Sequence, residues 1–173
     1  MKPEDIQALV KDVPDFPKPG IVFKDITPLL TDSAAFSAIT DCLEERSAAH
    51  RGDAILAIES RGFIFGAALA ERSGLPLHLV RKRGKLPRET VSVEYELEYG
   101  VDHVEVHADA IVPGERYLIV DDVIATGGTA AAAAQLVAKQ GGAVAACLFV
   151  LELTFLNGRD KLSGLTTESL IRY

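Results

Sequence analysis

The sequence predicts an α/β fold with a parallel sheet that helices cover on both faces, and two observations carry this prediction. Residues 54–80 contain a continuous apolar run, a helical stretch closed by Gly74 and a second apolar run, which is the order of a β-α-β unit. Residues 117–151 repeat that order. Continuous apolar strands alternating with helices are typical of parallel sheets buried on both faces.

Local patterns set the bounds of these elements. We expect the helix of the first unit to end at Gly74 and the helix of the second unit to end at Gly141, because glycine readily adopts the left-handed conformation that often follows a helix. The expected strands cover residues 54–58, 75–80, 117–120 and 143–151, and the expected helices cover residues 63–73 and 129–140.

Between the two units the apolar period changes to two. Apolar and polar residues alternate from Val91 to Tyr99 and again from Val104 to Val106. This alternation predicts a half-exposed antiparallel hairpin that lies outside the parallel sheet.

The first fifty residues have a different character. Apolar residues at helical spacing from Ile6 to Val13, after Pro3, predict a short helix. Three prolines then argue against regular structure up to Gly20, and a brief extended piece follows over residues 21–23. A second helix is expected from Asp32 or Ser33 to a point before Gly52.

Composition limits the classes of function. The chain has 173 residues, a formal net charge of -7, no Trp and 6% aromatic residues, so general nucleic-acid binding and membrane-surface binding are disfavoured. Cys42 and Cys147 lie in apolar runs without a CxxC pattern, which predicts reduced thiols in a single cytoplasmic domain. No signal peptide, membrane span or side-chain metal site is expected.

In a parallel sheet, ligands bind beyond the carboxyl ends of the strands. Residues 117–130, YLIVDDVIATGGTA, bring Asp121 and Asp122 to such an end and continue into a glycine loop and a helix. The backbone N–H groups of residues 126–129 can form an anion cradle at the helix N-terminus. The run matches neither GxxxxGK[ST] nor GxGxxG, and the alternative is that the acidic pair caps a turn.

Two neighbouring segments supply cations. Arg61 and Gly62 follow the first strand in ESRGF, and five cations follow the next one in RKRGKLPR, residues 81–88. An anionic small substrate explains this charge in an acidic protein, although a solvated basic face is the alternative. The hairpin that follows can act as a flap that excludes water from the site.

The run VDDVIATGGT resembles the phosphoribosyl-pyrophosphate (PRPP) motif of the type I phosphoribosyltransferases. The resemblance implies a Rossmann-like parallel-sheet core in one domain, residues 1–173, with a base-binding hood over 1–30 and a flap hairpin over 81–107. It implies that Asp121 and Asp122 hold the ribose hydroxyls. The implied 5′-phosphate ligands are Ala125, Thr126, Gly127, Gly128 and Thr129, and the implied pyrophosphate ligands are Ser60, Arg61, Gly62, Arg81, Lys82 and Lys85.

The identity of the base follows from a finer resemblance. The 6-oxopurine branch usually carries Asp at the position of Ala125, whereas FPKPGIVFKDITPLL, LEYG and LELTFLNGR are similar to the adenine branch. That branch implies an adenine pocket of Val22, Phe23, Lys24 and Leu153, with Glu98 near N7. Lys24 stands where many relatives have Arg, so its contact with the base is either through the backbone or through the side chain.

The resemblance implies a reaction in which adenine and PRPP give AMP and pyrophosphate. Mg2+ is expected to be carried mainly by the diphosphate, and Arg61, Glu98, Asp121 and Asp122 are the expected catalytic residues. A homodimer that binds neither nucleic acid nor membrane is expected. The alternatives are a transferase for another purine base and a non-catalytic regulator that senses PRPP or nucleotides.

Overall fold

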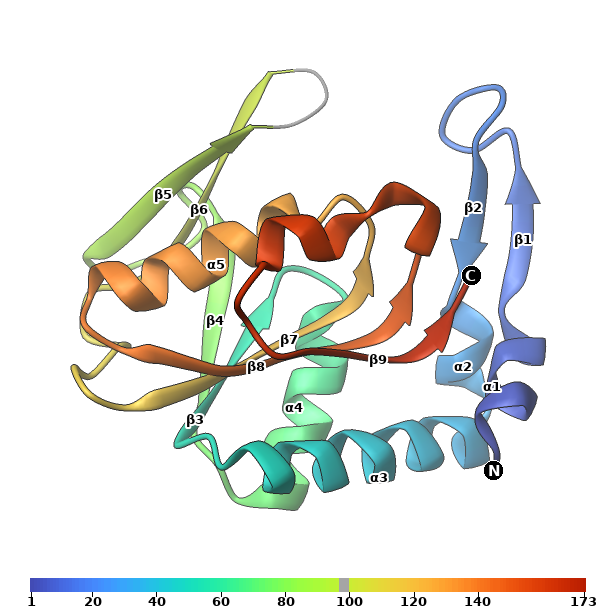
Figure 1. Ribbon diagram of the computed structural model, residues 1–173, viewed down its shortest axis with the longest axis horizontal. Coiled ribbons are helices and arrows are strands. Elements are labelled where there is room, and N and C mark those ends of the chain that lie inside the picture. The colour runs from blue at the N-terminus through green and yellow to red at the C-terminus, as the bar shows by residue number, and fades with distance from the viewer. Residues whose placement is uncertain (97–99) are drawn as a thin grey trace.

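The computed structural model describes residues 1–96 and 100–173, which build a mixed sheet with the strand order β5-β6-β4-β3-β7-β8-β9 (Figure 1). Neighbouring strands from β4 through β9 in this order run parallel, while β6 pairs antiparallel with β4 and β5. The strands are β3 (Ala54–Ile58), β4 (Leu77–Lys82), β5 (Thr90–Glu96), β6 (Val101–His107), β7 (Arg116–Ile124), β8 (Ala143–Glu152) and β9 (Thr167–Arg172).

Helices cover both faces of the sheet, as the continuous apolar strands predict. Helix α5 (Gly128–Lys139) lies on one face, and α3 (Ser33–His50) and α4 (Gly62–Ser73) lie on the other (Figure 1). Alternate residues of β3 divide between the two cores, since Leu56 packs with α5 residues and Ile55 packs with residues of α3 and α4. No helix among the described residues is long and apolar enough to cross a membrane.

The hairpin has the predicted period but not the predicted place. Strands β5 and β6 pair antiparallel, yet β6 also pairs with β4 at Arg81↔Glu105, so the hairpin extends the main sheet. The physical reason is that its apolar face, which includes Val93 and Tyr95, packs in the same core as α5. The predicted position outside the sheet is wrong.

The first thirty residues form a separate layer at one end of the sheet (Figure 1). It contains α1 (Pro3–Leu9), β1 (Lys11–Pro14), β2 (Val22–Asp25) and α2 (Thr27–Thr31), and β1 and β2 pair only with each other. The predicted helix through Val13 is too long, because Val13 pairs with Phe23 in the β1–β2 ribbon. Pro14 ends β1 rather than excluding it, since a two-stranded ribbon offers an edge position.

Strand β7 and two missed elements differ from the sequence prediction, whereas the start of α3 agrees with it. Strand β7 continues to Ile124, so the acidic pair lies inside the strand and not beyond it. The sequence analysis missed α2 and β9, the latter because its half-buried polar residues obscure the strand pattern. Helix α3 begins where predicted, with the Asp32 carboxylate accepting hydrogen bonds from the N–H groups of Ala34 and Ala35 at 3.0 Å each.

Close packing of α4 on β3 depends on Gly66. A Cβ atom at this position would lie 2.5 Å from the Cβ of buried Ala57. We therefore expect Gly66→Val to lower the free energy of unfolding by about 1–3 kcal/mol, because α4 must move away from the sheet. Urea unfolding followed by circular dichroism measures this change, and an unaltered midpoint would contradict the packing described here.

Candidate active site

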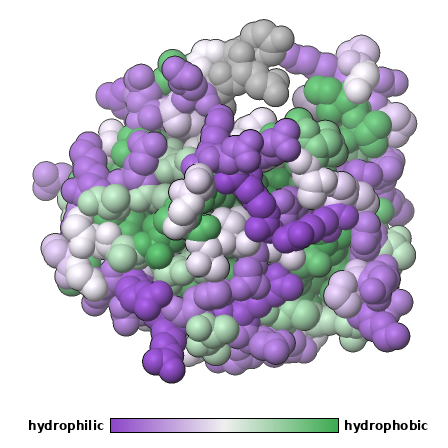
Figure 2. Space-filling model, in the orientation of Figure 1, coloured by the Kyte–Doolittle hydropathy of each residue, from purple (hydrophilic) through white to green (hydrophobic). Residues whose placement is uncertain are grey.

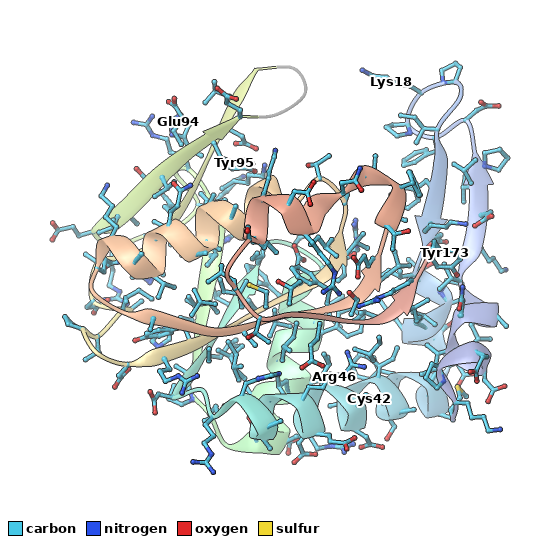
Figure 3. The ribbon with its side chains drawn as sticks, in the orientation of Figure 1. Lys18, Cys42, Arg46, Glu94, Tyr95 and Tyr173 are labelled. Carbon is cyan, nitrogen blue, oxygen red and sulfur yellow. The ribbon has the colours of Figure 1, made fainter. Side chains whose placement is uncertain are left out.

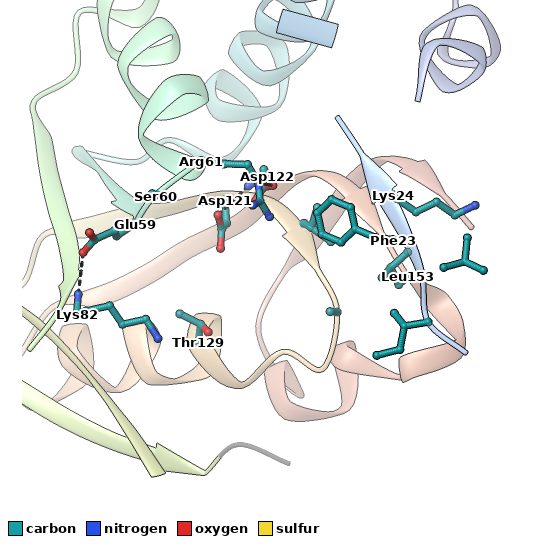
Figure 4. Close-up of a pocket in the computed structure, with 14 residues that line it drawn as sticks. Phe23, Lys24, Glu59, Ser60, Arg61, Lys82, Asp121, Asp122, Thr129 and Leu153 are labelled. Carbon is teal, nitrogen blue, oxygen red and sulfur yellow. Dashed lines mark hydrogen bonds and ion pairs between the residues drawn. The ribbon is translucent and has the colours of Figure 1, made fainter. Parts of the chain in front are cut away.

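A cavity of about 450 Å³ opens between the β1–β2 ribbon and the carboxyl ends of the central strands (Figure 4). Five sequence segments, within residues 21–24, 59–61, 82, 121–129 and 153, supply its walls. The lining residues are Ile21, Val22, Phe23, Lys24, Glu59, Ser60, Arg61, Lys82, Asp121, Asp122, Val123, Ala125, Thr129 and Leu153. This is the sheet edge at which the sequence predicts ligand binding.

The glycine loop after β7 forms a smaller recess of about 90 Å³ against the start of α5. Gly127 is the N-cap of α5 with φ +76°, and no side chain caps this helix end. A Cβ atom at Gly127 would lie 2.1 Å from the carbonyl oxygen of Gly158, so only glycine fits there. The free N–H groups of the first turn therefore remain available for an anion.

The acidic pair presents two carboxylates in different surroundings. Asp122 is 4% exposed and forms an ion pair with Arg61. The Asp121 carboxylate accepts the N–H of Asp122 at 2.8 Å and has no ion pair among the described residues. Burial, together with the nearby charge of Asp122, raises the pKa of Asp121 well above its ordinary value.

Residues 59–62 connect the acidic pair to the β1–β2 ribbon. The Arg61 guanidinium, bound to Asp122, lies 5.9 Å from the ring centroid of Phe23. Gly62 packs beneath the acidic pair, since a Cβ atom on it would lie 2.8 Å from Asp121 Oδ1. Gly62 therefore allows close packing against β7, and Arg61 lies in the cavity.

The basic run divides into residues inside and outside the cavity lining. Only Lys82 lines it, and its ammonium pairs with Asp102 on β6 and donates to Tyr95 Oη at 3.3 Å. Thr129 Oγ1 donates to the same phenol oxygen at 3.3 Å, so the hairpin contacts the start of α5.

Arg81 and Lys85 lie outside this lining. Arg81 donates two hydrogen bonds to Glu59, at 2.9 and 3.2 Å, and one to the Lys85 carbonyl at 3.0 Å. The Arg81 guanidinium holds the pKa of Glu59 below its ordinary value. Arg81 thus links the turn that carries Lys85 to Glu59, which lines the cavity.

The apolar half of the cavity is the candidate base pocket. The Phe23 ring contacts the Phe16 ring edge to face, with 5.2 Å between their centroids. Leu153, from the segment after β8, lines the cavity beside Phe23 (Figure 4). The Lys24 side chain points away from the pocket toward Asp12, with 2.6 Å between Nζ and Oδ1. Its backbone is therefore the part that can face a base. Glu98 lies outside the described residues.

Apolar surface also surrounds the mouth of this pocket. Figure 2 shows an apolar patch over the β1–β2 ribbon, where Phe16, Ile21 and Val22 are each about half exposed. These side chains form one rim of the cavity, and Ile21 and Val22 line it. An apolar rim suits a flat, poorly hydrated ligand better than a phosphate.

Some residues of the site escaped sequence reasoning. Glu59 lines the cavity. The sequence could have indicated it, because Glu59 directly follows the apolar run of β3, much as Asp121 follows the apolar run of β7. Tyr95 and Asp102 gave no signal beyond strand alternation, since only the pairing of β5 with β6 brings them to Lys82.

Comparison with known proteins identifies the family. Residues 27–163 match the phosphoribosyl transferase domain model. An adenine phosphoribosyltransferase of Rubrobacter xylanophilus is 54% identical over 97% of this chain and 91% of that protein. The crystal structure of adenine phosphoribosyltransferase from Thermoanaerobacter pseudethanolicus superposes with a TM-score of 0.96 at 51% identity, covering 99% of this chain and 100% of that one.

A more distant relative carries ligands. Adenine phosphoribosyltransferase from Saccharomyces cerevisiae, complexed with D-2,5-dideoxy-2,5-imino-altritol 1,6-bisphosphate and adenine, has a TM-score of 0.91 at 40% identity and covers 97% of each chain. Similarity thus extends over nearly the whole length in sequence and in structure. The chain belongs to the phosphoribosyltransferase family, among its adenine phosphoribosyltransferases.

Proposed function

We propose that this chain transfers the 5-phosphoribosyl group of PRPP to adenine, giving AMP and pyrophosphate, with the residues of the cavity in the roles given below. The observation that carries the proposal is a cavity that joins an acidic pair to an apolar pocket and that shares Asp121, Ala125 and Thr129 with the recess of the glycine loop. The full-length similarity to adenine phosphoribosyltransferases supports the same reaction.

The sugar phosphate is assigned to β7 and the loop that follows it. The 5′-phosphate accepts hydrogen bonds from N–H groups of residues 125–129, at the positive end of α5. Asp121 and Asp122 accept from the ribose hydroxyls, and their negative charge favours the cationic sugar that develops as the anomeric C–O bond breaks. Hydrogen bonds from the hydroxyls also favour the charged form of Asp121.

The leaving diphosphate is assigned to residues 60–62 and to the basic run. Arg61 and Lys82 line the cavity, and we assign Arg81 and Lys85, which a hydrogen bond joins in the neighbouring turn, to the same diphosphate. Their positive charge favours the negative charge that builds on the diphosphate. Closure of the hairpin over this side excludes water from the reacting sugar.

Mg2+ fits this site as a cofactor carried by the substrate. Among the described residues, no three His, Cys, Asp or Glu side chains gather to hold a metal alone. Carboxylate oxygens of the acidic pair, with phosphate oxygens, are the hard donors that Mg2+ prefers. Bound there, the ion supplies charge neutralisation to the leaving diphosphate.

Adenine is assigned to the apolar half of the cavity. Phe23 stacks on the ring, the backbone of Val22 and Lys24 meets its hydrogen-bonding edge, and Leu153 lines the pocket. Protonated Glu98 donates a hydrogen bond to N7, which directs N9 toward the anomeric carbon. The base loses its N9 proton overall, and no covalent intermediate is required.

The proposal includes the wider setting implied by the family resemblance. The chain acts as a homodimer in the cytoplasm, with residues 1–30 as the hood over the base and residues 81–107 as the flap. It binds neither nucleic acid nor membrane. Sedimentation analysis tests the dimer, and a mass of one chain at working concentration would contradict it.

The base preference is the direct test of the proposed activity. With PRPP and Mg2+, we expect adenine to release pyrophosphate at least a hundredfold faster than hypoxanthine or guanine, because Ala125 offers no acid to a 6-oxopurine. A panel of free bases measures this ratio. Equal turnover of hypoxanthine would favour a transferase for another purine base. PRPP binding without turnover of any base would favour a non-catalytic regulator that senses PRPP or nucleotides.

Replacing Asp121 by Asn should lower activity and raise stability. We expect Asp121→Asn to lower kcat by about tenfold to a hundredfold, since the developing sugar cation loses a charge. The same variant should unfold at a higher temperature at pH 7.

The sign of the stability change follows from linkage. The pKa of Asp121 is raised in the folded protein, so the folded state loses stability as pH rises above the ordinary pKa of aspartate. Asparagine removes this loss, and the difference between the two proteins should vanish under strongly acidic conditions. Thermal unfolding across pH measures it, and a less stable variant at pH 7 would contradict the raised pKa.

Glu98 tests the proposed proton donor. We expect Glu98→Gln to lower kcat with adenine about tenfold while the affinity for PRPP changes less than twofold, and Glu98→Leu to be worse. Single-turnover kinetics and PRPP titration of both variants provide the data. Unchanged kcat in both variants would contradict the proposed role of Glu98 as a proton donor.

A further inference from the structure

The β1–β2 ribbon pairs with no strand of the main sheet, so side-chain contacts must set its position. This matters for the base pocket, because Phe23 belongs to the ribbon whereas Leu153 belongs to the core. The two walls therefore keep a fixed separation only if some group bridges them. Loss of such a bridge would widen the base pocket and leave the glycine loop after β7 unchanged.

Tyr173, which follows β9, contacts the ribbon side of this gap (Figure 3). The Lys24 ammonium lies 4.1 Å from the centroid of the Tyr173 ring and is also bound to Asp12. The Lys24 side chain is only 14% exposed, so this cation–π contact is largely shielded from water. Tyr173 Oη also donates to the Gln7 carbonyl of α1 at 3.1 Å.

The backbone of the same residue is bound to the core side. Its N–H donates to the Glu152 carbonyl at 2.9 Å, and its carbonyl accepts the Thr154 N–H at 2.9 Å. These two bonds flank Leu153, the core residue that lines the base pocket. Tyr173 thus contacts Lys24 of the ribbon and Gln7 of α1 through its side chain, and the residues on either side of Leu153 through its backbone.

We propose that Tyr173 is a positioning residue for the base, which acts through Lys24 to hold the β1–β2 ribbon against Leu153. The inference rests on the proposed assignment of this half of the cavity to adenine. In this arrangement the Lys24 side chain holds the ribbon against Tyr173, and the Lys24 backbone faces the base. None of the contacts of Tyr173 reaches Asp121, Asp122 or the glycine loop.

The chemistry of the side chain supports this role. Burial, with a smaller effect of Asp12, raises the pKa of Tyr173 above its ordinary value. The phenol therefore remains neutral and keeps its proton for the Gln7 carbonyl. A neutral ring face is also what attracts the ammonium of Lys24.

Steady-state kinetics on the full chain tests the inference. We expect Tyr173→Leu to raise the KM for adenine about fivefold to tenfold, with the KM for PRPP changed less than twofold. Tyr173→Phe keeps the ring over Lys24 and should stay within about threefold of the parent. Glu168→Gln, which alters the ion pair of β9 with His50 far from the ribbon, is the matched control.

A double-mutant cycle identifies the contact. If Tyr173 acts through Lys24, Lys24→Met should raise the adenine KM similarly, and the double variant Lys24→Met/Tyr173→Leu should resemble either single variant. Effects that multiply would overturn the inference. So would an unchanged adenine KM in Tyr173→Leu, or equal increases for adenine and PRPP in that variant.

A parallel variant separates this inference from the proposed function. Phe23→Ala should raise the adenine KM more than Tyr173→Leu does, because it removes the stacking surface itself. If Phe23→Ala does so while Tyr173→Leu has no effect, the base pocket stands and the positioning role fails. If Phe23→Ala leaves the adenine KM unchanged, the pocket assignment fails and the inference with it.

Discussion

The contact between two glycine backbones, Gly127 and Gly158, is the constraint on which the site depends. A Cβ atom on Gly127 would lie 2.1 Å from the Gly158 carbonyl oxygen, and one on Gly158 would lie 2.3 Å from the Ala125 carbonyl oxygen. No side chain separates the glycine loop after β7 from the start of the short helix η2 (Gly158–Leu162) at this contact. This contact sets the loop beside the segment that carries Leu153, so the anion recess and the apolar pocket become parts of one site.

The buried carboxylates show which charges hold the fold and which remain for chemistry. Glu152 is 6% exposed and binds Arg159 through two hydrogen bonds of 2.6 and 2.8 Å, which holds the pKa of Glu152 below its ordinary value. Asp121 has no such partner among the described residues, and its pKa is raised. The charge of Glu152 is compensated inside the protein, whereas a carboxylate without a cationic partner at a cavity is a candidate for binding a ligand.

Much of the site was predictable because parallel strands bring their carboxyl ends to one edge. The run from Tyr117 to Ala130 predicts an acidic pair, a glycine loop and a helix, and the structure contains all three in order. The sequence did not show which of the five cations of residues 81–88 line the cavity. Of these only Lys82 lines the cavity, and Arg81, Lys82 and Arg88 are each paired with an acid, Glu59, Asp102 and Asp109 respectively. Charge alone does not reveal such pairing.

The sequence by itself determined the covered parallel sheet, its two β-α-β units and the glycine loop after β7, because these follow from apolar runs and from glycines within a few residues of each other. The tertiary structure decided the rest. It joined the hairpin to β4, brought Tyr95 and Asp102 to Lys82, and turned the Lys24 side chain toward Asp12 and Tyr173. Each depends on contacts between residues distant in the chain, and no local pattern encodes those contacts.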